Sequence, residues 1–162
     1  MAGAKRDGVQ IAGALPVNWW APYIGTPFGV LPGQLTCWGL VRAVYLDVRG
    51  IALPTYGELA ADYVRNRGTE CFMRGTRVAI SRTMMNAAAS QVWAEPQAPV
   101  ETDVVLMSNP RSGSRVVGHV GVLVGKNRVL HIEDASGAVV VPLAHFSVAS
   151  RVRGFRTYQG PK

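Results

Sequence analysis

The chain has 162 residues, of which 48% are hydrophobic and 17% are charged, and its formal net charge is +7. This length fits one domain spanning residues 1–162, and the composition excludes an intrinsically disordered protein. The 18 glycines and 10 prolines indicate many turns and short strands. The positive charge favours a polyanionic partner such as an acidic wall polymer. Lys and Arg are scattered, however, and match no nucleic-acid-binding module, so we expect no nucleic acid among the partners.

The chain carries no pattern of a membrane protein. No stretch approaches the roughly 18 consecutive apolar residues of a membrane span. Residues 1–16 are expected to form an N-terminal arm, in which Lys5 and Arg6 precede a stretch that is too polar for the core of a signal peptide. The two cysteines, Cys37 and Cys71, do not make a disulfide framework. We therefore expect a protein that is made in the cytoplasm.

The N-terminal part is expected to contain helices. Residues 17–24 predict a short helix with an aromatic face, and the Gly- and Pro-rich residues 25–33 predict a loop. Helical periodicity predicts a second helix over 37–49, with Thr36 as its N-cap and Gly50 as its stop signal. The apolar side of this helix consists of Leu40, Val41, Val44, Tyr45 and Val48.

Residues 58–98 have the weakest pattern of the chain. We expect them to be a variable helical insertion, with one helix over 58–65 and an Ala- and Met-rich helix over 80–93. Pro96 and Pro99 end this section.

From residue 103 onward the apolar residues recur with a period of two, which is typical of strands. Turn residues separate the segments, and helices followed by strands indicate an α+β domain with an antiparallel sheet. The five predicted strands are 103–108, 116–124, 128–133, 138–141 and 153–158.

Cys37 is the first residue of the predicted helix, where backbone N–H groups lack partners within the helix. Such groups and the helix dipole lower the pKa of a thiol, and the thiolate is a strong nucleophile. We therefore expect Cys37 to be an activated thiol. The alternative is a small inert hydrophobic residue, which is what a buried cysteine usually is.

His119 and His131 lie in consecutive predicted strands. A three-residue connection over 125–127 places His131 opposite Gly121 and on the same face as His119, at a diagonal distance of about 7–8 Å. A side chain at Gly121 would crowd the space between the two rings. Glu133 falls on the same face as His131. The alternative for either histidine is a packed core residue.

Together these residues predict thiol catalysis, with Cys37 as the nucleophile, His119 as the base and His131 as the group that holds the base in one tautomer. The backbone N–H of Cys37 is the expected oxyanion donor. The same three residues are possible metal ligands, but no CxxC or HExxH spacing supports a metal site. We expect neither a metal nor another cofactor.

At these residues the sequence resembles the NlpC/P60 family of cysteine peptidases, and in particular its phage-type members. The resemblance covers both ends of the domain and leaves residues 58–98 poorly matched. The segments that carry it are YIGTPF at 23–28, CWGLVRAVY at 37–45, GIALPTY at 50–56, GHVGVLVG at 118–125 and VLHIED at 129–134.

The resemblance implies a papain-like fold, in which an N-terminal catalytic helix packs on a five- to six-stranded antiparallel sheet. It assigns the nucleophile to Cys37, the base to His119 and the third polar residue to His131. The residues that it assigns to substrate binding are Tyr23, Phe28, Trp38 and Gly118.

The resemblance also implies a function. The family cleaves stem peptides of bacterial peptidoglycan, and its phage-type members belong to the tail tip or to tail assembly. We therefore expect an endopeptidase of the virion tail that opens the wall during genome entry and contacts other phage tail proteins. A bacterial wall hydrolase is a weaker option, because no export signal is seen.

Two positions depart from the family pattern. Thr36 stands where the family usually has Asp, and Phe28 stands where many members carry a tyrosine that helps the oxyanion site. Without that hydroxyl, Tyr23 is the residue expected to substitute. These departures motivate the alternative of a structural tail-tip or tail assembly protein that retains the peptidase fold with little or no activity.

Overall fold

The computed structural model describes residues 14–55, 85–86, 90–109 and 116–160. The predicted arm up to residue 13, the predicted helix over 58–65 and most of the predicted insertion lie outside the described residues, as does Cys71. No described helix is both long enough and apolar enough to cross a membrane.

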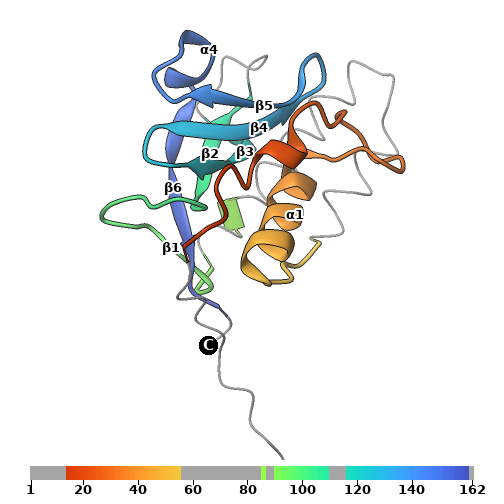
Figure 1. Ribbon diagram of the computed structural model, residues 1–162. Coiled ribbons are helices and arrows are strands. Elements are labelled where there is room, and N and C mark those ends of the chain that lie inside the picture. Colours follow the sequence, from red (N-terminus) through yellow and green to blue (C-terminus); the bar gives the residue numbers. More distant parts are fainter. Residues whose placement is uncertain (1–13, 56–84, 87–89, 110–115, 161–162) are drawn as a thin grey trace, which may run out of the picture.

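A six-stranded sheet forms the centre of the fold (Figure 1). Its strands follow the order β1-β6-β2-β3-β4-β5, and every neighbouring pair is antiparallel. The predicted α+β class and the antiparallel sheet are thereby confirmed. The strands are β1 (Trp93–Ala94), β2 (Val104–Ser108), β3 (Val117–Val124), β4 (Arg128–Glu133), β5 (Gly137–Pro142) and β6 (Val152–Tyr158).

The predicted helix is confirmed at both ends as α1 (Cys37–Arg49). The Thr36 hydroxyl accepts a hydrogen bond of 3.0 Å from the backbone N–H of Gly39, as an N-cap does. Gly50 ends the helix with a left-handed φ of 66°, which glycine adopts without a steric penalty. Cys37 is therefore the first helical residue.

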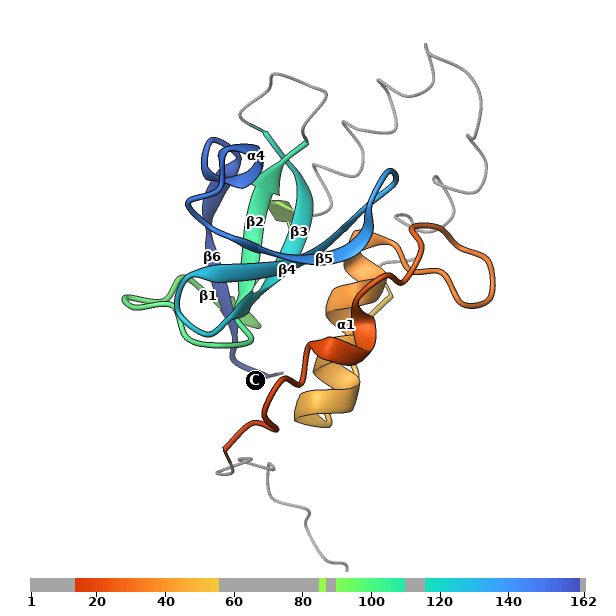
Figure 2. The same ribbon diagram turned by 45° about the horizontal axis from the view of Figure 1, so that its top comes forward.

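Both faces of the sheet are buried. One face packs against α1 and contributes Val120, Val122, Leu130 and Ile132 to the larger core cluster. The opposite face forms a second core with α4 (Phe146–Ala149), through residues that include Met107, Leu123, Val129 and Val148. Figure 2 shows α1 and α4 well apart, with β4 and β5 crossing β2 at a steep angle in a strongly twisted sheet.

The predicted helix over 17–24 is reduced to a single 3₁₀ turn, η1 (Ala21–Tyr23). Pro22 lacks a backbone N–H, and Gly25 follows with a left-handed φ of 81°, so the turn does not propagate. The predicted aromatic face is present, because Trp19 and Tyr23 are buried in the larger core.

The helical prediction over 80–93 is wrong at its C-terminal end. Trp93 begins β1 and pairs with Tyr158 of β6, so the sheet gains a sixth strand. The Trp93 ring contacts the rings of Trp38, Tyr45 and Tyr158 edge-on, with centroid distances of 6.2, 5.8 and 5.1 Å. These long-range aromatic contacts outweigh the local helical pattern.

Candidate active site

The β3–β4 hairpin has the predicted register. Val124 pairs with Arg128 across the connection 125–127. A Cβ atom at Gly121 would lie 2.6 Å from Cγ2 of Val129 and 3.1 Å from Cβ of His131. Glycine is therefore required at this position, because any other residue would press on the side chains of β4.

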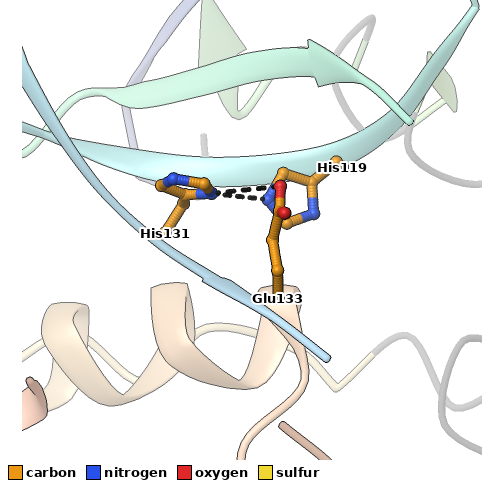
Figure 3. Close-up of side chains that lie close together, drawn as sticks. All are labelled: His119, His131 and Glu133. Carbon is orange, nitrogen blue, oxygen red and sulfur yellow. Dashed lines mark hydrogen bonds and ion pairs between the residues drawn. The ribbon is translucent and has the colours of Figure 1, made fainter. Parts of the chain in front are cut away.

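The two histidines meet on this hairpin (Figure 3). Nε2 of His119 lies 3.2 Å from Nδ1 of His131, and the two rings are nearly perpendicular. Both side chains are buried. One nitrogen donates a proton and the other accepts it, so the tautomers of the two rings are linked. This contact has the geometry that a base and its orienting group require.

Two further residues, which the sequence did not single out as functional, complete this cluster. Oε1 of Glu133 lies 3.5 Å from Nδ1 of His131 and forms an ion pair with the guanidinium of Arg151. Nε of Arg151 donates to the carbonyl of Ser108 at 3.0 Å. The strand alternation had placed Glu133 beside His131, but no sequence pattern pointed to Arg151, which is 18 residues farther along.

Burial keeps both imidazoles neutral. It lowers the pKa of His119 well below the ordinary value of 6.5, and the charges of His131 and Arg151 lower it further. Burial also lowers the pKa of His131, although the carboxylate of Glu133 partly opposes this effect. At neutral pH each ring therefore has a nitrogen lone pair available to accept a proton or bind a cation.

The thiol of Cys37 has a different environment. The nearby backbone N–H groups of Val120, Trp38 and Cys37 itself favour the thiolate and lower the pKa of the thiol. Burial acts more strongly in the opposite direction, and the net effect raises the pKa. The expectation of a lowered thiol pKa is therefore wrong for this state, because desolvation of the thiolate outweighs three N–H groups.

The structure does not join the thiol to the histidines by a hydrogen bond. His119 pairs with Met107, which belongs to the core on the α4 side, whereas Val120 belongs to the core that Cys37 packs against. Among the described residues, neither imidazole forms a hydrogen bond with the Cys37 thiol. The backbone N–H of Val120, which acts on the thiol, belongs to the residue that follows His119, so Cys37 and the histidine pair approach neighbouring residues of β3.

A sequence model of the NlpC/P60 family matches residues 25–156, which is most of the chain and includes α1 and the whole histidine cluster. The chain belongs to the NlpC/P60 family. Its fold is similar to that of a lipoprotein-like NLP/P60 family protein from Staphylococcus aureus, with a TM-score of 0.54 and 20% sequence identity.

The alignment with that structure covers 88% of this chain but only 40% of the staphylococcal chain. At this level of identity the likeness shows a shared fold. No curated protein matches the sequence.

Two of the residues assigned to substrate binding are buried in this NlpC/P60 domain. The Tyr23 hydroxyl donates to Oδ2 of Asp47 at 2.8 Å. Asp47 is ten residues from Cys37 on α1, or about 15 Å along the helix axis, so the Tyr23 hydroxyl does not reach the thiol. The Trp38 indole donates to the carbonyl of Pro54 at 2.9 Å, and its ring packs in the core.

The other two residues assigned to substrate binding lie closer to the predicted site. Phe28 is half-buried and forms a bridge with Leu35, two residues before Cys37. Gly118 is the extra residue of a bulge in β3, immediately before His119. Bulges commonly redirect the side chains that follow them. Substrate binding by either residue stays a prediction.

Proposed function

We propose that this NlpC/P60 domain is a phage tail-tip cysteine endopeptidase that cleaves stem peptides of bacterial peptidoglycan during genome entry. The observation that carries the proposal is the position of Cys37. Its thiol lies at the start of α1, where nearby backbone N–H groups favour the thiolate, and one of these groups belongs to the residue after His119. The net charge of +7 is suited to an anionic wall.

The proposed reaction uses the thiol and the imidazole in their neutral forms. As the Cys37 sulfur attacks the scissile carbonyl carbon, its proton passes to His119 and a tetrahedral oxyanion forms. The C–N bond then breaks, the leaving amine takes the proton from His119, and a thioester remains on Cys37. Water hydrolyses the thioester with His119 again as the base. His131 holds the ring of His119 through the 3.2 Å contact.

This mechanism requires the imidazole of His119 to reach the thiol when the substrate binds. Catalytic hydrogen bonds are often long or absent in the free enzyme and form only in the substrate complex. The oxyanion would be stabilised by the backbone N–H groups at the start of α1, because Phe28 has no hydroxyl and the Tyr23 hydroxyl is bonded to Asp47.

The direct test is digestion of purified peptidoglycan by the full chain, with the released muropeptides identified by mass spectrometry. We expect the wild type to release cleaved stem peptides and Cys37→Ala to release none. Cys71→Ala, which removes the other cysteine, is the matched control and should remain active. Circular dichroism checks that each variant is folded. Equal digestion by Cys37→Ala and the wild type would exclude the proposed mechanism.

The second candidate is a structural tail-tip or tail assembly protein. The raised pKa of the Cys37 thiol and the missing hydrogen bond to His119 favour it. A phage carrying Cys37→Ala distinguishes the two. If it assembles and infects like the wild type, and the purified wild-type protein releases no muropeptides, the chain acts as a scaffold. Detection of the chain in the tails of purified virions tests the location that both candidates share.

A further inference from the structure

Three ligand atoms face one another on the β3–β4 hairpin. We propose that His119, His131 and Glu133 form a binding site for a divalent transition-metal ion such as Zn²⁺, and that the bound ion blocks the peptidase reversibly. The binding site stands on geometry alone, whereas the inhibitory effect rests on the proposed function.

The distances between the three atoms suit one ion. Nε2 of His119 lies 3.2 Å from Nδ1 of His131, and Oε1 of Glu133 lies 3.5 Å from the same Nδ1. All three atoms lie within 4.8 Å of one another. Ligands about 2.1 Å from a tetrahedral Zn²⁺ are about 3.4 Å apart. The two shorter distances therefore need little change to accommodate the ion.

Hydrogen bonding alone explains this arrangement poorly. Nδ1 of His131 faces both His119 and Glu133, as Figure 3 shows, although one ring nitrogen carries at most one proton. If Nδ1 donates to His119, the carboxylate of Glu133 is left 3.5 Å away, too far for a good hydrogen bond. A cation between the three atoms would interact with all of them at once.

The surroundings of Glu133 resemble the support that ligating carboxylates have in metal sites. The guanidinium of Arg151 is buried, binds Oε1 of Glu133 and is itself anchored to the carbonyl of Ser108. Such outer partners orient a ligating carboxylate. The positive charge of Arg151 also opposes a cation, so we expect an exchangeable ion with a fourth position open to water, not a permanent structural ion.

Occupancy of this site would stop the proposed reaction. A metal on Nε2 of His119 leaves the ring proton on Nδ1, the nitrogen that would otherwise accept the proton of the thiol, and it replaces the contact with His131 that orients the ring. Among the described residues, the ligand atoms that lie within reach of one ion come from His119, His131 and Glu133, and Cys37 is not in this group. The ion therefore acts on the base and leaves the thiol unbound.

Spectroscopic titration with Co²⁺ tests the site without any activity measurement. The full chain, freed of metal with EDTA, is titrated with Co²⁺, and Zn²⁺ is then added as a competitor. We expect one Co²⁺ per chain, with the visible absorption of a four-coordinate ion and no sulfur-to-cobalt charge-transfer band. Zn²⁺ should displace the Co²⁺.

Variants identify the ligands. Glu133→Gln should weaken Co²⁺ binding at least about tenfold, and His131→Ala serves as a second ligand variant if Glu133→Gln fails to fold. Asp134→Asn is the matched control, because Asp134 is the neighbouring exposed carboxylate. Cys37→Ala should bind Co²⁺ like the wild type. Failure of the wild type to bind, unchanged binding by folded Glu133→Gln and His131→Ala, or loss of binding in Cys37→Ala would each overturn the site.

Muropeptide release measured with EDTA and then with added Zn²⁺ separates this inference from the proposed function. Release in EDTA that Zn²⁺ suppresses in the wild type, but less in Glu133→Gln, supports both. Co²⁺ binding without any release in EDTA supports the site and refutes the peptidase. Release that Zn²⁺ leaves unchanged refutes the inhibition.

Discussion

The start of α1 and the β3–β4 hairpin form the two halves of the candidate site, and they are built differently. At the helix, backbone N–H groups act on the Cys37 thiol. On the hairpin, His119 and His131 are held by side chains, among them Glu133 and Arg151. Backbone donors depend on the fold alone, whereas the hairpin half depends on individual charged residues. Substitutions should therefore affect the two halves very differently.

Removing the predicted base should have the largest effect of all these substitutions, and the effect is on the rate of muropeptide release. His119→Ala should reduce muropeptide release about 100- to 10,000-fold, because the thiol would lose its proton acceptor. His145→Ala is the control, since His145 is exposed and caps α4. The measurement is the initial rate of release by folded variants. Equal rates for His119→Ala and the wild type would show that the hairpin half takes no part in the chemistry.

The pH dependence of thiol alkylation tests the helix half alone. In a Cys71→Ser background, the rate of Cys37 modification by iodoacetamide should rise about tenfold per pH unit from pH 6 to above pH 8.5, because burial raises the pKa of the thiol. Mass spectrometry follows the modified protein. A fast rate that is already constant at pH 6 would instead show a thiolate in the resting protein. The backbone N–H groups would then lower the pKa of the thiol by more than burial raises it.

Replacing the buried guanidinium should destabilise the hairpin half. Arg151→Met leaves the carboxylate of Glu133 without its ion-pair partner and should lower the free energy of unfolding by about 2–3 kcal/mol. Arg153→Met, at an exposed position, should cost less than about 1 kcal/mol. Urea unfolding measures both. Equal losses would indicate that the charge of Arg151 is not what supports the cluster.

Two glycines of β3 allow a matched test of how closely the side chains pack around His131. Gly121→Ala should cost about 1–3 kcal/mol, because its Cβ would lie 2.6 Å from Cγ2 of Val129. Gly118→Ala should cost less, since its Cβ would meet Asn109 at an ordinary 3.6 Å. The midpoints of urea unfolding give the comparison. The predicted requirement for glycine at 121 does not hold if the two variants are equally stable.

Acidification should produce the smallest of these effects, a modest loss in the free energy of unfolding. The pKa values of His119 and His131 lie below 6.5 in the folded protein, so the unfolded chain binds more protons. The free energy of unfolding should therefore fall as the pH decreases from about 6.5. His119→Gln should reduce this slope, as measured by urea unfolding at pH 7.5 and 5.5. An unchanged slope in His119→Gln would show that His119 is not buried in its neutral form.

Short-range patterns predicted a large part of this fold. The apolar period, Thr36 and Gly50 located both ends of α1, because capping depends on residues adjacent in sequence. The length of the connection 125–127 determined the register of the hairpin, since one residue more or fewer would turn every side chain to the other face. The proximity of His119 and His131 followed from that register.

Other features depended on contacts between residues far apart in the sequence, and the sequence patterns did not predict them. Trp93 joined the sheet because three aromatic rings from two distant segments, α1 and β6, pack around it. The prediction of a lowered pKa for Cys37 was wrong because burial raises the pKa, and the extent of burial cannot be deduced from a helix start alone. Arg151 was missed because its partners, Glu133 and Ser108, are 18 and 43 residues away in the sequence.

By itself, the sequence determined the family, the helix that begins at Cys37 and the hairpin that pairs His119 with His131, because these depend on local spacing. Only the tertiary structure decided how the two halves face each other. Packing buried both imidazoles and left Cys37 partly buried against the core on the α1 side. It also gathered Glu133 and Arg151 around the histidines, which made the predicted base a candidate metal ligand as well.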